Sequence, residues 1–464
     1  MIARLFFAIL LVLAACATPA VAPELPAIAI VGATVVHPTR DVEPNATVLI
    51  RGDRIVAVGA HVAVPANAKV IDARGKFVIP GMIDTHVHFF QSANPFTRPD
   101  AFDLDAMTPY KDEVARNKAR LPTTFKTWLA CGVTTVADVG GPFWNFDVRD
   151  ASTKMPAPRV FVAGPLLSMV SREKLDLGDP PIIKVTSPDE ARALVARELP
   201  RKPDFIKLWF IHQPSDDLAK QEEIARAGAD AAHAAGVRFA VHATELDVAK
   251  ASLRAGANIL VHSVSDAKVD AELIELAKKN KVIYTPTLFV PLGYALVGSG
   301  EWTPTEAERR LADPQILDAL AKTKVPDGAV PERARARFAR LDRNGPAKID
   351  AENLRALWDA GIVIATGTDA GNIGTVHGPS IFREIEFMAK AGLTPKEILL
   401  ATTTNGAKFV AMEKDLGEIA PGMLADLVVL DADPLADSAN LSRAFRVFKG
   451  GEVFDPSEIA RSMR

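Results

Sequence analysis

The chain has 464 residues, of which 48% are apolar and 24% are charged, and its formal net charge is only -3. This length suits a large single barrel with an accessory domain, or two to three domains, and the apolar fraction is enough for a sizeable core. The balanced charge excludes an intrinsically disordered chain and a broad basic surface, so nucleic acid is not expected as a partner.

Residues 1–16 are expected to be an export signal. Arg4 precedes an apolar run over residues 5–15, and Leu13-Ala14-Ala15-Cys16 is similar to a bacterial lipobox. In a lipobox the chain is cut before the cysteine and the cysteine sulfur is lipidated, so the mature protein would begin at Cys16. The alternative is an ordinary signal peptide cut near Ala20 or Ala22. Both alternatives predict export, and the lipobox predicts a periplasmic protein with a lipid anchor in a bacterial membrane.

Residues 17–26 are rich in alanine and proline, which is typical of a short tether. The only other cysteine besides Cys16 is Cys131, so no internal disulfide is expected in the exported protein. Stability must therefore come from the core.

Short apolar runs separated by turn signals occupy both ends of the mature chain. Residues 27–78 contain runs at 28–31, 47–50, 54–58 and 69–72, and residues 413–464 contain runs at 427–431 and 446–454. This spacing is typical of small antiparallel strands. We expect the two ends to build one β-sandwich together.

Between these ends, over residues 79–412, apolar strands alternate with long helical patterns. We expect strands at 78–86, 133–139, 159–163, 205–210, 239–242, 259–262, 282–288 and 362–366. Helices are expected at 188–199, 221–235, 246–255, 271–279, 351–360 and 380–391. The alternation is typical of βα units around a parallel sheet, and eight strands predict a closed barrel. The expected fold class is therefore α/β, a (β/α)8 TIM-like barrel with a small β-sandwich domain.

An insertion of about residues 291–346 is too long for a plain connection. It is rich in arginine, with Arg333, Arg335, Arg337, Arg340 and Arg343. The favoured interpretation is a solvated helical face. The alternative is a lid that lends an arginine to an anionic substrate.

Polar side chains end five of the predicted strands. They are His86 and His88 in the stretch Asp84-Thr85-His86-Val87-His88, followed in chain order by Lys207, His242, His262 and Asp369. The carboxyl ends of the strands of a βα barrel converge on one mouth, where chemistry occurs. Burying a titratable group there costs desolvation free energy unless a partner offsets that cost. Imidazoles with a carboxylate are ligands that borderline cations accept. Each residue alone could be a satisfied core group, but together they predict a metal site.

The order of these residues, with Ile79-Pro80-Gly81-Met82-Ile83-Asp84-Thr85-His86-Val87-His88, resembles the amidohydrolase superfamily. The likeness is to its imidazolonepropionase-like and prolidase-like branch and covers nearly the whole mature chain. The tail that begins Gly417-Glu418-Ile419-Ala420-Pro421-Gly422 also resembles the family's return into the β-sandwich. The resemblance implies a (β/α)8 barrel, two divalent ions and a metal-dependent hydrolase acting on carbon–nitrogen bonds.

Carried over to this chain, the resemblance implies a role for each ligand. His86, His88 and Asp369 would bind the more buried ion, His242 and His262 the more exposed one, and Lys207 would bridge both. Because a lysine ammonium has no lone pair, Lys207 would have to be carboxylated by carbon dioxide. A bridging water acidified to hydroxide would attack the amide, and Asp369 would move the proton to the departing amine. The ions are expected to be zinc, with manganese, iron or cobalt also acceptable to these ligands.

The favoured substrate is a small linear amide next to a free carboxylate, namely a dipeptide of the Xaa-Pro kind or an N-acyl amino acid. His377, in a glycine-bracketed loop after Asp369, and Tyr284 are the candidate substrate contacts. A structural role is the equal alternative for His377, and a core position is the favoured interpretation of Tyr284. The chain could also form a homo-oligomer.

Two alternatives remain open. One is a mononuclear cyclic-amide hydrolase or deaminase of the same superfamily, for which Glu245 lies three residues after His242 as a candidate proton-transfer group. Mononuclear members generally lack the bridging lysine, so Lys207 argues against it. The other alternative is a non-catalytic binding or scaffold barrel, which predicts gaps in the ligand set; here all six ligands are present.

Overall fold

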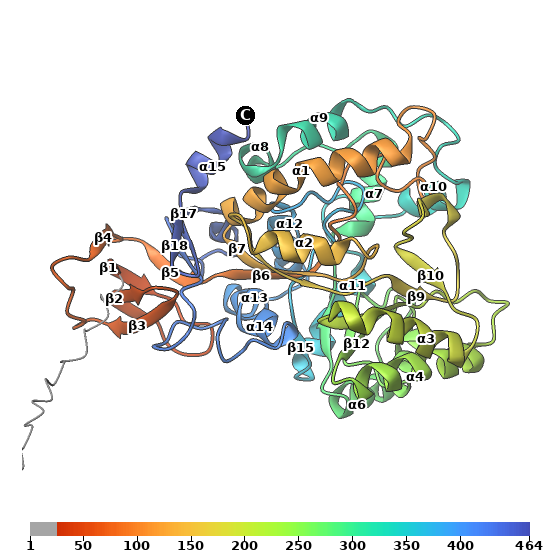
Figure 1. Ribbon diagram of the computed structural model, residues 1–464, viewed down its shortest axis with the longest axis horizontal. Coiled ribbons are helices and arrows are strands. Elements are labelled where there is room, and N and C mark those ends of the chain that lie inside the picture. The colour runs from red at the N-terminus through yellow and green to blue at the C-terminus, as the bar shows by residue number, and fades with distance from the viewer. Residues whose placement is uncertain (1–25) are drawn as a thin grey trace, which may run out of the picture.

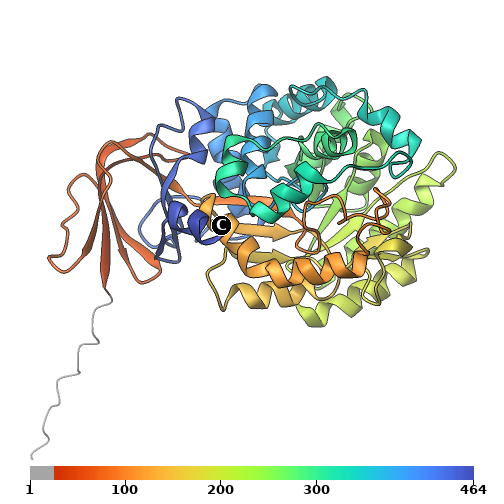
Figure 2. The same cartoon turned by 90° about the horizontal axis from the view of Figure 1, so that it is seen from above.

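The computed structural model describes residues 26–464. A small all-β part stands beside a larger part in which helices surround parallel strands (Figure 1). The two parts are equally distinct after a quarter turn (Figure 2). The predicted signal sequence, Cys16 and residues 17–25 of the tether lie outside the described residues.

The all-β part is one eight-stranded sheet that joins both ends of the chain, in the order β18-β17-β16-β5-β1-β2-β3 with β4 paired to β1. Its strands are β1 (Ala27–Val35), β2 (Glu43–Arg51), β3 (Arg54–Gly59), β4 (Lys69–Asp72), β5 (Phe77–Pro80), β16 (Leu427–Leu430), β17 (Ala444–Lys449) and β18 (Glu452–Phe454). The junction is the antiparallel pair of β5 and β16, in which Val78 faces Val429. Both ends share one apolar core, to which Ile30 and Phe448 belong. Burying this core therefore requires residues from both ends of the chain.

Each of the eight strands predicted for the barrel overlaps an observed strand. They are β6 (Met82–Val87), β7 (Val133–Asp138), β8 (Arg159–Val162), β11 (Phe205–Trp209), β12 (Arg238–His242), β13 (Ile259–Val261), β14 (Ile283–Thr285) and β15 (Val363–Ile364). Two short strands, β9 (Leu166–Ser168) and β10 (Ile182–Lys184), extend the sheet beside β11. The first predicted strand is in fact two, because the chain leaves the terminal sheet at Pro80 and enters the barrel at Met82.

The barrel strands pair as a three-stranded sheet, β6-β7-β8, and a seven-stranded sheet, β10-β9-β11-β12-β13-β14-β15, so the ladder is not continuous. Backbone hydrogen bonds outside the strand ladders join the two sheets. Thr85 N donates to Thr366 O at 3.0 Å on one side, and Asp204 N donates to Val162 O at 2.9 Å on the other. The predicted α/β class with a TIM-like arrangement is confirmed, with this gap in the pairing.

Helices cover the outside of the strands. They are α1 (Tyr110–Ala130), α2 (Asn145–Ser152), α3 (Pro188–Glu198), α4 (Leu218–Ala234), α5 (Leu246–Arg254), α6 (Ala271–Lys279), α11 (Lys348–Asp359), α12 (Ser380–Lys390), α13 (Pro395–Thr402) and α14 (Thr404–Phe409). Their starts follow local chemistry. The Ser187 side chain accepts from Glu190 N at the start of α3, and Asp217 accepts from Ala219 N and Lys220 N at the start of α4.

The insertion after β14 folds into four short helices. These are α7 (Val290–Ser299), α8 (Glu306–Leu311), α9 (Pro314–Lys322) and α10 (Glu332–Phe338). They share a separate apolar core with the loop after β6, to which Phe102, Trp302 and Leu320 belong. The C-terminal helix α15 (Pro456–Ser462) packs on α1 rather than extending the terminal sheet.

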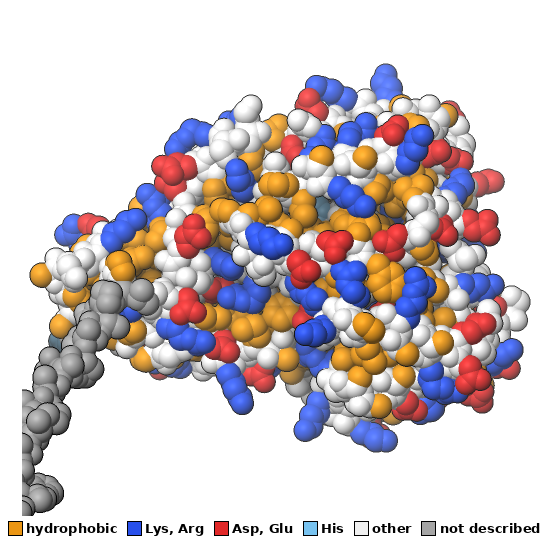
Figure 3. Space-filling model, viewed as in Figure 1, with side chains coloured by type: hydrophobic (Ala, Val, Ile, Leu, Met, Phe, Trp, Pro, Cys, Tyr) orange, Lys and Arg blue, Asp and Glu red, His pale blue; other side chains and the backbone are white. Residues whose placement is uncertain are grey.

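Acidic and basic side chains are interspersed over the face shown in Figure 3, with apolar side chains between them. This mixture agrees with the small net charge of the chain. Within residues 26–464, no helix combines the length and apolarity needed to cross a bilayer.

Candidate active site

All six predicted ligand residues line one cavity of about 820 Å³. His86 lies in β6, Lys207 lies in β11 and His242 ends β12, while the other three directly follow strands or lie in the loop after β15. The carboxyl ends of the parallel strands thus bring to one place residues that are up to 283 positions apart, the separation of His86 and Asp369. A cavity of this size can hold a drug-sized ligand, since such sites measure about 300–1,000 Å³.

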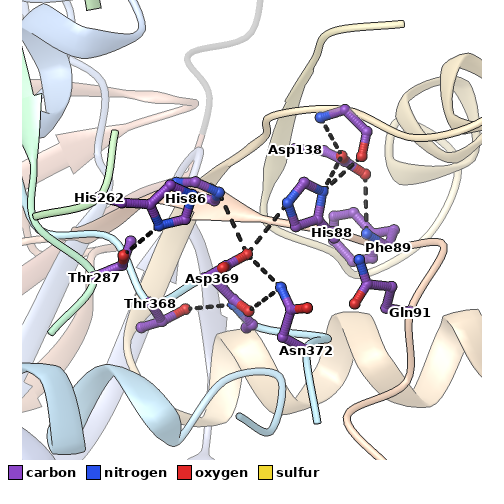
Figure 4. A network of polar contacts seen from close by, with 12 residues as sticks. His86, His88, Phe89, Gln91, Asp138, His262, Thr287, Thr368, Asp369 and Asn372 are labelled. Atoms are coloured by element: carbon purple, nitrogen blue, oxygen red, sulfur yellow. Dashed lines mark hydrogen bonds and ion pairs between the residues drawn. The ribbon is translucent and has the colours of Figure 1, made fainter. Parts of the chain in front are cut away.

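Asp369 lies between His86 and His88 (Figure 4). Its Oδ1 atom is 3.3 Å from His86 Nε2 and 3.2 Å from His88 Nε2. The three side chains are buried, and their ligand atoms lie within 4.8 Å of one another. This is the geometry of a facial set that could hold one metal ion.

His242 and His262 form the other half of the cluster. Their ring centroids are 4.3 Å apart, and the His262 ring is 4.7 Å from that of His86. Thr287 Oγ1 lies 2.7 Å from His262 Nδ1 and holds the ring. His88 Nδ1 is 2.6 Å from the Gly140 carbonyl, which can only accept, so Nδ1 carries the proton and Nε2 keeps its lone pair for a metal.

Burial keeps the cluster in the protonation states that a metal requires. It lowers the pKa of His86 to about 3 and holds the pKa values of His242 and His262 well below 6.5, so the three rings are neutral. Burial opposes ionisation of Asp369, yet the adjoining His86 and His88 rings hold the pKa of its carboxyl well below 3.8. The cluster therefore offers neutral imidazoles and a carboxylate.

Lys207 is the least satisfied member of the cluster. Burial lowers the pKa of its amine to about 7, with Asp369 opposing the change. Among residues 26–464, the Nζ atom of Lys207 and both ring nitrogens of His86 have no hydrogen-bond partner. Buried polar atoms are rarely left unpaired, so these donors fit a divalent metal that completes their bonding.

Two of the six residues have left-handed backbone conformations, with φ of 74° at His262 and 59° at Asp369. Such angles cost about 1–3 kcal/mol in residues other than glycine and are concentrated at functional sites. Backbone hydrogen bonds stabilise both conformations. Asp369 N donates to His86 O at 2.7 Å, and His262 N donates to Thr285 O at 2.8 Å. These bonds aim both side chains into the cavity.

Sequence reasoning missed the polar residues that support the cluster. Asp84 accepts from Thr368 N and Thr368 Oγ1, which fixes the loop that carries Asp369. Asp138 accepts from Phe89 N and Gly140 N, next to His88. Asp138 ends the apolar strand β7 and Asp84 lies inside β6, two residues before His86, so the signal used for the ligands could have found Asp138.

The structure corrects both predicted substrate contacts, because neither side chain lines the cavity. His377 Nε2 donates to Gln91 O, and its ring stacks on Phe89 in the core. Tyr284 is buried, and its hydroxyl accepts from Val264 N. The prediction for His377 failed because the glycine-bracketed loop turns into the core after Asn372, which carries the ring away from the cavity.

The mononuclear alternative loses its supporting residue, since Glu245 is exposed and does not line the cavity. The arginines of the insertion divide. Arg343 pairs with Glu301 at 2.9 Å and Arg335 lies 3.5 Å from Asp327, whereas Arg333 and Arg337 line the cavity. Arg333 and Arg337 are both exposed, as the favoured prediction of a solvated helical face requires, and they border the cavity as well.

Comparison with known proteins gives a consistent family. Residues 77–453 match the amidohydrolase family. An imidazolonepropionase of Cutibacterium acnes is 28% identical over 420 residues, covering 84% of each chain. An imidazolonepropionase of Streptomyces coelicolor is 26% identical over 399 residues, covering 84% of this chain and 86% of the relative.

Solved structures give the same fold. A putative prolidase from Bifidobacterium longum is 25% identical with a TM-score of 0.70, covering 93% of this chain and 95% of the other. A Xaa-Pro dipeptidase with bound methionine in the active site is 23% identical with a TM-score of 0.71, covering 92% and 100%. The chain therefore belongs to the amidohydrolase family, which is metal-dependent, and it is a hydrolase acting on carbon–nitrogen bonds.

Proposed function

We propose that the cluster holds two divalent metal ions and hydrolyses a linear amide next to a free carboxylate. His86, His88 and Asp369 would hold one ion, and His242 and His262 the other. Lys207 would bridge them as a carbamate. The observation that carries this proposal is the buried, unpartnered Lys207 amine in the wall that these four histidines and Asp369 share.

The carbamate needs an uncharged amine, which a pKa of about 7 supports. The nitrogen lone pair would attack dissolved carbon dioxide, a carbon–nitrogen bond would form, and the amine proton would be lost to solvent. The product is an anionic carboxylate on Nζ, which supplies the oxygen ligands that the free amine lacks. Zinc is the preferred ion, and manganese, iron and cobalt accept the same ligands.

Divalent ions held by these residues would supply Lewis-acid chemistry, namely an acidified water and polarisation of the amide carbonyl. Asp369 would accept the proton from that water and deliver it to the departing nitrogen, because an amide anion is a poor leaving group. Its position between His86 and His88 supports this role. The His88 to Gly140 and His262 to Thr287 contacts would hold the rings in place meanwhile.

A dipeptide of the Xaa-Pro kind or an N-acyl amino acid is the proposed substrate. Support comes from the likeness to the Xaa-Pro dipeptidase and the putative prolidase. The test is to screen zinc-loaded protein against dipeptides and N-acyl amino acids, with Asp369→Asn beside the wild type. The variant should keep most of its metal and lose at least about a thousandfold in turnover. Near-normal turnover would refute the role of Asp369.

The second candidate is a mononuclear cyclic-amide hydrolase, which the likeness to imidazolonepropionases favours. The exposed position of Glu245 weighs against it. A screen that includes cyclic amides, together with a count of metal ions per chain, separates the two candidates.

A further inference from the structure

Four arginines line the cavity beside the histidine cluster, and besides Arg98 three of them come from two distant segments. Arg172 follows β9, and Arg333 and Arg337 lie on α10. Residues of α10 and of the loop that connects β9 and β10 border the same cavity. An arginine pair and a third arginine thus border one opening.

The charge around Arg172 is not balanced. Asp100 is bound by both ends of the Arg98 guanidinium, at 2.7 Å each, and Arg172 Nε lies 3.4 Å from the same carboxylate. Arg98 Nη1 donates in addition to Asn372 Oδ1. Two guanidinium groups therefore share one carboxylate, and Arg98 holds it through two of its nitrogens. The surplus positive charge falls on Arg172, whose side chain is 34% exposed.

Arg172 is also held in position. Its guanidinium carbon lies 4.7 Å from the centroid of the Trp209 ring, which it covers. Trp209 ends the strand that carries Lys207, and its ring is 6.1 Å from that of His242. The stacking fixes Arg172 within reach of a ligand bound at the histidines, at little cost in side-chain entropy.

Arg333 and Arg337 are one helical turn apart and face the same side of α10. Within residues 26–464, Arg333 forms no ion pair or hydrogen bond. Arg337 lies near Asp350, but burial raises the pKa of that carboxyl, which weakens it as a counter-charge. Neither arginine is paired with a carboxylate among the residues that the structure describes.

We propose that Arg172, with Arg333 and Arg337, forms a subsite that binds the free carboxylate of the substrate. The inference rests on the proposed function for the cleaved bond, and it assigns the recognition of the neighbouring anion to residues outside the metal cluster. The planar fork of Arg172 suits a carboxylate bound through two hydrogen bonds. The two helical arginines would strengthen binding from the rim.

The test uses pairs of ligands that differ only in this charge, namely N-acetyl amino acids and dipeptides and their C-terminal carboxamides. N-acetyl-L-leucine and N-acetyl-L-leucinamide are the first pair. Calorimetry measures binding to zinc-loaded protein, and acetate release measures hydrolysis. Arg172→Gln should weaken binding and raise KM for the carboxylates by about ten- to hundredfold and leave the carboxamides unchanged.

Arg172→Lys keeps the charge without the fork and should fall between the wild type and Arg172→Gln. The double variant Arg333→Gln/Arg337→Gln should weaken the carboxylates by about three- to tenfold, because exposed charges contribute less. Arg192→Gln, at an exposed pair with Asp189 on α3, is the matched control and should change neither ligand.

Equal effects of Arg172→Gln on both members of each pair would overturn the inference, as would a wild type that does not prefer the carboxylates in binding. If the preference is present and depends on Arg172 but no linear amide is hydrolysed, the subsite stands and the proposed function fails. If linear amides are hydrolysed without that preference, the reverse holds.

Discussion

The side-chain amide of Asn372 donates to Asp369 Oδ1 at 2.6 Å. Its own oxygen accepts from the Tyr294 hydroxyl at 2.6 Å and from Arg98 at 3.2 Å. Because a guanidinium can only donate, the amide must point its oxygen toward Arg98 and its nitrogen toward Asp369. The cavity wall therefore fixes the orientation of the carboxylate on which the proposed proton transfer depends.

Asn372→Ala should lower kcat by about ten- to hundredfold, the range expected when a hydrogen bond to a charged group is lost, and should change KM little. The exposed Asn344 offers a matched control, Asn344→Ala, which should leave kcat unchanged. Steady-state kinetics on the substrate found by screening measures both. A rise in KM with an unchanged kcat would show that Asn372 contacts substrate instead of positioning Asp369.

Gly371→Ala should disturb the metal cluster. Gly371 has φ of 104°, and a Cβ atom there would lie 2.4 Å from His88 O. Gly178 has a similar φ of 95°, but no described atom lies within 4 Å of a Cβ atom placed there. Gly178→Ala is therefore the control, in which only the unfavourable backbone conformation lowers stability. Elemental analysis should show a loss of bound metal for Gly371→Ala only, and thermal unfolding of both variants should show the larger fall in Tm for Gly371→Ala. Equal behaviour of the two variants would mean that the loop tolerates the displacement.

Glu198 should make the protein less stable as the pH rises. Burial raises the pKa of its carboxyl well above 4.5, and neither oxygen has a hydrogen-bond partner. The unfolded chain releases this proton at a lower pH than the folded protein does, so the free energy of unfolding falls as pH rises above about 4.5. This contribution is absent below that pH, where both states are protonated.

Glu198→Gln should therefore raise the Tm at about pH 8, and the gain should vanish toward about pH 4.5. Glu223→Gln, at an exposed position of α4, is the matched control and should show no such trend. A gain that is independent of pH would indicate that packing rather than ionisation separates the variant from the wild type.

Cys16 lies outside the described residues, and export with a lipid anchor remains a proposal. Cys16→Ala should move the protein from the membrane fraction to the soluble fraction of the bacterial envelope, because lipidation requires the cysteine sulfur. Fractionation followed by immunoblotting measures this. A wild type that is already soluble would favour the ordinary signal peptide cut near Ala20 or Ala22.

The family, the fold class and the strands that carry the cluster could be predicted from the sequence. His242 and His262 were found because each closes an apolar run, and a parallel barrel brings the carboxyl ends of such runs together. Their ring contact was not needed for the prediction. The roles of the six residues as ligands remain predictions.

The cavity wall could not be predicted in the same way. Arg98, Arg172 and Asn372 come from loops, where no periodicity reports which way a side chain points. His377 shows the converse error, since its position near Asp369 in sequence said nothing of the inward turn that stacks it on Phe89. Loop residues become interpretable only once the strands that support them are placed.

The central claim is that Lys207 joins two metal ions in one centre. Elemental analysis of protein reconstituted with zinc and bicarbonate tests it most directly, with Lys207→Ala and the exposed-surface variant Lys220→Ala measured in parallel. We expect two zinc ions per chain in the wild type and Lys220→Ala, and one or none in Lys207→Ala. One ion in the wild type, or two in Lys207→Ala, would contradict the account.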